Sequence, residues 1–234
     1  MLDQFLCRVN KYPWYSLRMQ PGLRERKKRA ARQAISNVAT GLIFEHGFDN
    51  VTVAEIAEAA GFSKMTVFNY FPRKEDMFLD RRDEAEELLL GAIRARPPGL
   101  PVVEAVRALM HRLLAEGHPL SGAQAHVAVF GRVVADSPAL RSRAREQRDE
   151  LESAVAALLT EETGDPLGAD LVGKLLLATL HTVLTTAAQR LMAGDTATAV
   201  AADQIGVIDR AFDLLANGIG GIGADAPRSP HTPT

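Results

Sequence analysis

The sequence predicts an all-α protein, with a three-helix helix-turn-helix domain near the N-terminus and a larger C-terminal helical domain. Residues with strong helix propensity dominate the composition, whereas β-branched and aromatic residues are sparse in most segments. Apolar residues also recur at three- and four-residue steps over long stretches. The 234 residues are enough for one large or two smaller domains with hydrophobic cores. We expect four parts: an arm at 1–22, the helix-turn-helix domain at 23–72, the larger domain at 73–218 and a disordered tail at 219–234.

The first predicted helix follows an N-terminal stretch without clear periodicity. Met19 stands just before Pro21 and Gly22, so either Met19 is the natural start of the protein or residues 1–18 are a loosely held arm. From 23 to 46 the apolar spacing predicts a helix that opens with the basic run RERKKRAAR. Gly47 is placed to end this helix, because glycine takes the left-handed conformation without steric cost.

A helical corner is predicted between residues 52 and 71. Thr52 and Glu55 have the spacing of a capping box, which starts a short helix at Thr52. Gly61 interrupts that helix, and Ser63 can cap a second one. Two short helices joined by a tight glycine turn form a helix-turn-helix.

Further helices are predicted along the rest of the chain. Pro72 stops the second short helix and precedes a long one at 73–95, which RPPG at 96–99 breaks. The remaining apolar patterns predict helices near 101–116, 122–135, 138–163, 169–193 and 197–217. The glycines and prolines after these helices predict the disordered tail.

Charge is unevenly distributed along the chain. Residues 1–82 hold 14 Lys and Arg against 9 Asp and Glu, whereas residues 83–234 hold 13 against 20. A basic head on an acidic body favours contact between the head and a polyanion. On charge alone, a solvated helix face explains the basic run at 24–32 equally well.

Several kinds of site and location are disfavoured by the sequence. Cys7 is the single cysteine, which excludes an intrachain disulfide and a cysteine-based zinc site. The four histidines of the body, at 111, 118, 126 and 181, lack the spacing of an HExxH or Glu-x-x-His metal motif, so we expect no metal and no other cofactor. We also expect no membrane-spanning segment and a cytoplasmic location.

The second helix of the corner carries side chains that are suited to contacts in a DNA major groove. Val67 and Phe71 lie one turn apart and point inward. The N-terminal turn presents hydroxyls, a cation and an apolar tip, from Ser63, Lys64, Met65 and Thr66. Lysine suits guanine O6 and N7, apolar groups suit the thymine methyl, and hydroxyls suit phosphate. The competing interpretation is an ordinary helical hairpin.

The stretch TVAEIAEAAGFSKMTVFNYFPRKEDMF resembles the DNA-binding signature of the TetR family of bacterial transcriptional regulators. The resemblance covers about residues 30–80, and beyond 80 it is one of architecture alone. It implies an N-terminal DNA-binding domain and a C-terminal domain for ligand binding and dimerisation.

The resemblance also implies roles for individual residues. Bases would be contacted by Lys64, Met65 and Phe68. Phosphates would be contacted by Thr52, Thr66, Asn69, Tyr70 and Lys74, although Asn69 also suits an adenine edge. Sequence-independent affinity would come from a basic arm of Arg24, Arg26, Lys27, Lys28 and Arg29. Phe68 stands where the family usually has tyrosine, which leaves an apolar wall suited to a thymine methyl.

The helices near 169–193 and 197–217 are apolar on more than one side, so each has a second face to bury. The resemblance implies that they pair with the same helices of a second copy to form a homodimer; the alternative is two central helices of a monomer. It also implies a pocket for an unknown small apolar ligand in the body. Candidate wall residues are Met110, His126, Phe130 and His181.

These inferences predict a transcriptional regulator, in the form of a homodimeric repressor that a small ligand releases from a palindromic double-stranded DNA operator. The sequence shows no catalytic residue set, so we expect no enzyme activity. Two alternatives stay open: a DNA-binding protein without a ligand switch, and a metal-binding enzyme that uses the helical bundle.

Overall fold

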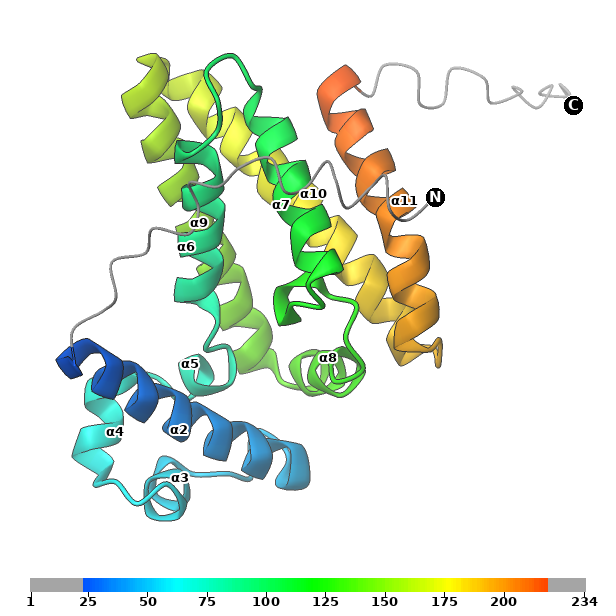
Figure 1. Ribbon diagram of the computed structural model, residues 1–234. Helices are drawn as coiled ribbons and strands as arrows, with labels where there is room; N and C mark the ends of the chain where they lie inside the picture. The colour runs from blue at the N-terminus through cyan, green and yellow to red at the C-terminus, as the bar shows by residue number, and fades with distance from the viewer. Residues whose placement is uncertain (1–22, 219–234) are drawn as a thin grey trace, which may run out of the picture. The chain divides into compact units, whose positions relative to one another are not determined.

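The computed structural model describes residues 23–218, and every regular element within that range is helical (Figure 1). The predicted arm and tail lie outside the described residues. The helices are α2 (Leu23–His46), α3 (Val53–Ala59), α4 (Lys64–Tyr70), α5 (Lys74–Phe78), α6 (Arg82–Arg94), α7 (Val102–Ala115), η2 (Pro119–Ser121), α8 (Val127–Asp136), α9 (Pro138–Thr163), α10 (Pro166–Met192) and α11 (Ala197–Asn217). The all-α prediction is confirmed.

The described residues form two compact units. The head unit contains 23–84 and 128–147, and the body unit contains 85–127 and 148–218. Helices α6 and α9 therefore contribute residues to both units. The predicted head at 23–72 did not include α8 or the first part of α9.

The head unit is built on α2, with α3, α4 and α5 packed beside it (Figure 1). Ile35, Ile43 and Ile56 are fully buried in its core, which α4 joins through Val67. Burying each such side chain stabilises the fold by about 1.5–3 kcal/mol. One side of this core is aromatic, and its contacts explain why residues 128–147 belong to the head.

Phe78 of α5 lies at the centre of the aromatic side. Its ring meets that of Phe44 edge to face, at 5.6 Å between centroids, and stacks on that of Phe130 at 4.8 Å. Such ring pairs contribute about 0.5–1.5 kcal/mol beyond the area they bury. They attach α8 to the helix-turn-helix core through residues that are far apart in the sequence.

The body unit has a core of its own, in which α7, α10 and α11 lie side by side (Figure 1). Leu176 of α10 and Ile208 and Phe212 of α11 are fully buried in it. Gln204 is also buried, and its amide Nε2 donates to the backbone oxygen of Val183 at 3.0 Å. That bond satisfies a polar group that would be costly to leave unpaired in the core.

The prediction of one helix over 73–95 was wrong. The segment divides into α5 and α6, with a break at 79–81. At the break, Ser36 of α2 donates its hydroxyl to the carboxylate of Asp80, and Gln147 of α9 donates to the backbone oxygen of Leu79 at 3.2 Å. Both partners are distant in sequence, so local periodicity could not reveal the break.

Two other predicted boundaries were also wrong. The helix predicted at 122–135 begins at Val127, because Gly122 has a φ of +78° and ends the short helix η2. The helix predicted to start at 169 begins at Pro166, capped by Asp165, whose side chain accepts from the Gly168 amide at 3.0 Å. Proline suits the first turn of a helix, because a backbone N–H at that position would have no acceptor within the helix.

The expectation that no segment could span a membrane needs a correction. Among the described helices, α10 is long and apolar enough to do so by length and composition. Core helices of soluble proteins meet the same criterion, and α10 buries one side, including Leu176, Val183 and Ala187, in the body unit.

Candidate nucleic-acid interface

The first helix of the corner, α3, begins with the predicted capping box. The Glu55 amide donates to Thr52 Oγ1 at 3.2 Å. In return, the Thr52 amide and hydroxyl donate to Glu55 Oε2 at 2.7 and 2.8 Å. These bonds fix where α3 starts and occupy the hydroxyl proton of Thr52. They also lower the pKa of Glu55 below its usual 4.5, chiefly through the backbone hydrogen bond from Thr52.

The lowered pKa makes the capping box sensitive to acid. Its contribution to stability is present above the usual pKa of glutamate and is lost as the pH falls through the lowered value. We expect Glu55→Gln to unfold at a lower temperature than the parent protein at neutral pH, with the difference shrinking as the pH falls through the lowered pKa of Glu55 and the parent carboxyl becomes protonated as well. Thermal unfolding as a function of pH measures this. Glu58→Gln, on the same helix but outside the box, should retain the parent's pH dependence.

The turn between α3 and α4 is held by glycine and a second cap. Gly61 has a φ of +72°, a conformation that side chains disfavour, and the Phe62 amide donates to the Ala57 oxygen at 2.9 Å. Ser63 then caps α4, because its Oγ accepts from the Thr66 amide at 3.1 Å. The helix-turn-helix predicted from these positions is confirmed.

Helix α4 buries one face and exposes another. Val67 is fully buried, whereas Met65 is 72% exposed and Phe68 is 40% exposed. Lys64 and Asn69 are also exposed, and the Lys64 ammonium lies 6.0 Å from the centre of the Phe68 ring. The three predicted base-reading residues, Lys64, Met65 and Phe68, therefore share the solvent-facing part of this helix. The head unit therefore exposes an apolar surface, formed by Met65 and Phe68, next to the charge of Lys64.

The C-terminal end of α4 is held by α2. Tyr70 is half-buried, and its backbone oxygen accepts from Arg32 Nη1 at 2.9 Å. The Arg32 guanidinium also lies 4.1 Å from the centre of the Phe71 ring and 3.3 Å from an oxygen of Asp83. Arg32 therefore fixes the orientation of α4, a role that its position in the basic run did not reveal.

Lys74, a predicted phosphate contact, is engaged within the head unit. Its Nζ donates to the backbone oxygens of Phe48 and Val51 at 2.7 and 2.9 Å. The same atom lies 4.0 Å from the centre of the Phe48 ring. Two of the three ammonium donors are thus used by the loop that precedes α3.

The remaining predicted contacts are placed as follows. Thr66 is half-buried, and its Oγ1 shares a hydrogen bond with Ser63 Oγ at 2.8 Å. The predicted basic arm forms an exposed part of the first turns of α2, and its residues are Arg24, Arg26, Lys27, Lys28 and Arg29. These positions suit a basic surface next to α4.

The four predicted pocket residues are divided between the two units. Met110 is buried in the core of the body unit, whereas His126 and His181 are exposed there. Phe130 belongs to the head unit, where it stacks on Phe78. Although His181 is exposed, its partial desolvation, and secondarily the charge of Arg148, lowers its pKa below the usual 6.5. The ligand pocket proposed from these four side chains therefore stays a prediction.

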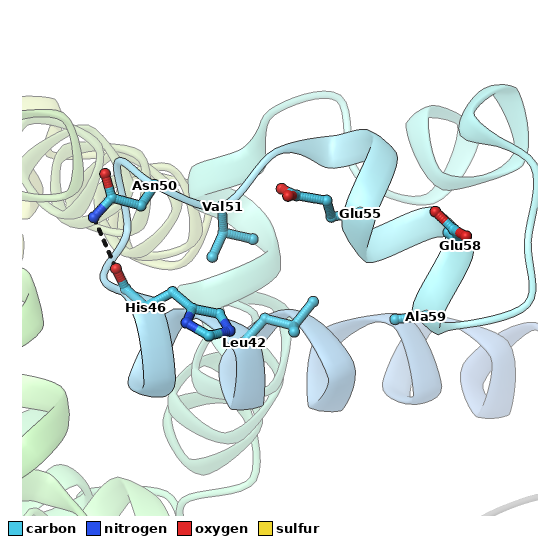
Figure 2. A pocket seen from close by; sticks show the side chains of 7 residues that line it. All are labelled: Leu42, His46, Asn50, Val51, Glu55, Glu58 and Ala59. Carbon is cyan, nitrogen blue, oxygen red and sulfur yellow. Dashed lines mark hydrogen bonds between the residues drawn. The ribbon is translucent and has the colours of Figure 1, made fainter.

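One surface pocket lies in the head unit, between the end of α2 and α3 (Figure 2). Its walls include the imidazole of His46 and the carboxylates of Glu55 and Glu58, and Asn50 Nδ2 donates to the His46 oxygen at 2.9 Å. Sequence patterns did not indicate this pocket, because its lining comes from two helices and a loop. Within the described residues, no group of three or more His, Cys, Asp or Glu side chains is arranged to hold a metal ion.

A helical protein in which two capped helices form a tight corner, with one face of the second exposed next to a basic helix, has the architecture of a helix-turn-helix transcription regulator. Residues 35–80 match the model of the bacterial regulatory proteins of the tetR family. The HTH-type transcriptional regulator TcmR of Streptomyces glaucescens is 30% identical over 168 residues, which cover 70% of this chain and 74% of that protein. The chain belongs to the TetR family, and it is a DNA-binding regulator rather than an enzyme.

Solved structures agree with this fold. FadR of Thermus thermophilus, a TetR-family transcriptional repressor in complex with lauroyl-CoA, is 26% identical; the match covers 85% of this chain and all of that one, with a TM-score of 0.50. SmeT in complex with triclosan is 18% identical, with coverage of 86% and 99% and a TM-score of 0.52. At that identity the second likeness concerns the fold alone.

Proposed function

We propose that the protein is a homodimeric repressor that binds a palindromic operator and leaves it when a small apolar ligand binds the body. The observation that carries the DNA-binding part is the exposed surface of α4, where Lys64, Met65 and Phe68 face solvent together. Their chemistry suits a guanine edge and thymine methyl groups. Thr66, Asn69 and Tyr70 would contact phosphates, Thr52 would do so by exchanging a bond to Glu55 for one to phosphate, and the basic arm would add affinity that is independent of sequence.

Two exposed apolar stripes support the dimer. On α10, Leu171 and Leu175 are 56% and 44% exposed and lie one turn apart. On α11, Ile205 is 43% exposed, and a Cβ added at its neighbour Gly206 would meet open space. These stripes suit a four-helix interface with the same helices of a second copy, in which Gly206 permits close approach. A dimer also presents two recognition helices to two half-sites.

The ligand part of the proposal is supported by the relatives. FadR of Thermus thermophilus, with an acyl-CoA bound, shows that a family member of this fold accommodates a long apolar group. For release, the ligand must bind the form with low operator affinity better than the form with high affinity. Helices α6 and α9 contain residues of both units and are the candidates to transmit that change. A DNA-binding role also favours a cytoplasmic location.

Selection of bound sequences from a random pool of double-stranded DNA tests the proposal. We expect a palindromic motif, because two identical subunits present the same surface to each half-site. A selected motif without symmetry would contradict the dimeric reading of the operator. Adding long-chain acyl-CoA to the complex tests release, since equal affinity with and without it would exclude that ligand.

The same selection with Lys64→Ala tests the assignment of base contacts. Loss of a lysine that reads a base edge should relax the preference at one position of each half-site, at a cost of about 1–3 kcal/mol. Lys28→Ala, in the exposed basic arm, is the matched control and should weaken binding to all sequences alike. A uniform loss in both variants would show that Lys64 contacts the DNA backbone only.

A further inference from the structure

Lys74 lies at a place where buried backbone needs a hydrogen-bond donor. The loop of residues 47–52 leads from α2 to α3, and its residues Phe48 and Val51 are only 5% and 3% exposed. Carbonyl groups of buried loops lose water and require a donor from the protein. The Lys74 ammonium donates to both of these carbonyls, at 2.7 and 2.9 Å.

The Lys74 side chain is held at both of its ends. Lys74 is the first residue of α5, a helix whose Met77 and Phe78 are fully or almost fully buried in the head core. At the other end the ammonium lies 4.0 Å from the centre of the Phe48 ring, a cation–π contact that strengthens in a partly buried site. The extended side chain therefore connects α5 to the loop before α3.

The bonded carbonyls stand next to the start of α3. Val51 immediately precedes Thr52, whose amide and hydroxyl form the capping box with Glu55. Fixing the Val51 carbonyl fixes the peptide plane that joins Val51 to Thr52, because the peptide unit is planar. The direction in which the first turn of α3 presents its amides thus depends on the Lys74 ammonium.

From these contacts we infer that Lys74 is a positioning residue for operator binding, which acts by holding the loop of residues 47–52 and the start of α3, and is not a phosphate contact. This inference rests on the proposed DNA-binding function. It replaces the role that sequence alone suggested for Lys74, because two of the three ammonium donors already bind the loop.

The salt dependence of operator affinity separates the two roles. A lysine that neutralises a phosphate contributes about 0.9 to the slope of log K against log salt concentration, whereas a positioning residue contributes nothing to it. We expect Lys74→Met to lower operator affinity about tenfold, through two carbonyls left without a donor, with the slope unchanged. A slope that falls by about 0.9 with unaltered stability of the DNA-free protein would overturn the inference.

Amide exchange of the DNA-free protein tests the contacts of Lys74 without relying on DNA binding. We expect the amides from residue 48 to 56 of Lys74→Met to exchange with solvent about tenfold faster, while those of the body unit keep their rates. Lys74→Arg, which retains the charge and the donors, should keep most of the protection and affinity. Unchanged exchange in Lys74→Met would overturn the inference, whereas absence of any operator for the parent protein would refute the proposed function alone.

A double-mutant cycle distinguishes positioning from general destabilisation. If Lys74 acts through the start of α3, the affinity losses of Lys74→Met and Thr52→Ala should overlap, so the double variant binds more tightly than the product of the two losses predicts. Binding is measured well below the unfolding temperature of each variant. Strictly multiplicative losses would show that Lys74 does not act through Thr52.

Discussion

Replacing Leu175 by aspartate is expected to convert the protein to a monomer and to lower operator affinity by about 10²–10⁴-fold. Leu175 is 44% exposed in the apolar stripe of α10, where a dimer would bury it. A carboxylate in the dry centre of an interface is costly, because burial removes its hydration without supplying a partner. In a monomer, each recognition helix binds its half-site alone. It loses the increase in effective concentration that comes from linkage to the recognition helix of a second subunit.

Sedimentation velocity and operator titration measure the two effects. Val129→Asp is the matched control, since Val129 is also 44% exposed and apolar but lies on α8, outside the proposed interface. The control should retain the oligomeric state and the affinity of the parent protein. A dimeric Leu175→Asp variant would place the interface elsewhere, and loss of the dimer without loss of affinity would show that a monomer suffices for operator binding.

Local sequence signals predicted the corner helices well, because caps and turns are specified by neighbouring residues. Thr52 and Ser63 form the caps that their spacing indicated, and Gly61 has the positive φ of the turn. The bounds of α2, α9 and α11 also match the prediction. In each of these elements the residues that predict a cap, a turn or a helix end lie within a few residues of the feature that they specify.

Features that depend on distant contacts escaped prediction. The break between α5 and α6 is held by Ser36 and Gln147, and residues 128–147 join the head through Phe130. Lys74 was predicted to contact phosphate, because nothing in the local pattern shows that its ammonium reaches the loop after α2. The roles of single residues at the candidate site were therefore less predictable than its fold.

A largely buried ion pair in the head unit joins Asp76 of α5 to Arg143 of α9, which are 67 residues apart. Arg143 Nε donates to Asp76 Oδ1 at 2.6 Å, and Gln147 Nε2 donates to the same oxygen at 3.1 Å. The side chains of Asp76 and Arg143 are only 15% and 13% exposed. Water is thus largely excluded from this pair of opposite charges, and Arg143 is the charged partner of Asp76.

Breaking this pair from one side should destabilise the head strongly. Arg143→Met is expected to cost about 3–5 kcal/mol, because it leaves the Asp76 carboxylate in a poorly hydrated place with only Gln147 as a donor. For a chain of this length that corresponds to a decrease in unfolding temperature of roughly 6–20 °C, measurable by calorimetry. Arg81→Met is the control in the same unit: its partner Glu84 is exposed, and the loss should stay below about 1 kcal/mol.

The double variant Arg143→Met/Asp76→Leu determines what the pair contributes beyond its own desolvation. Since apolar side chains need no hydration, the double variant should recover most of the stability that Arg143→Met loses. Arg143 also donates to Glu146, from Nη1 to Oε2 at 3.2 Å, but Glu146 retains its ion pair with Arg73 at 2.5 Å in both variants, so its charge remains paired. If the double variant is as unstable as the single one, the loss comes from packing of the arginine side chain and not from an unpaired buried charge.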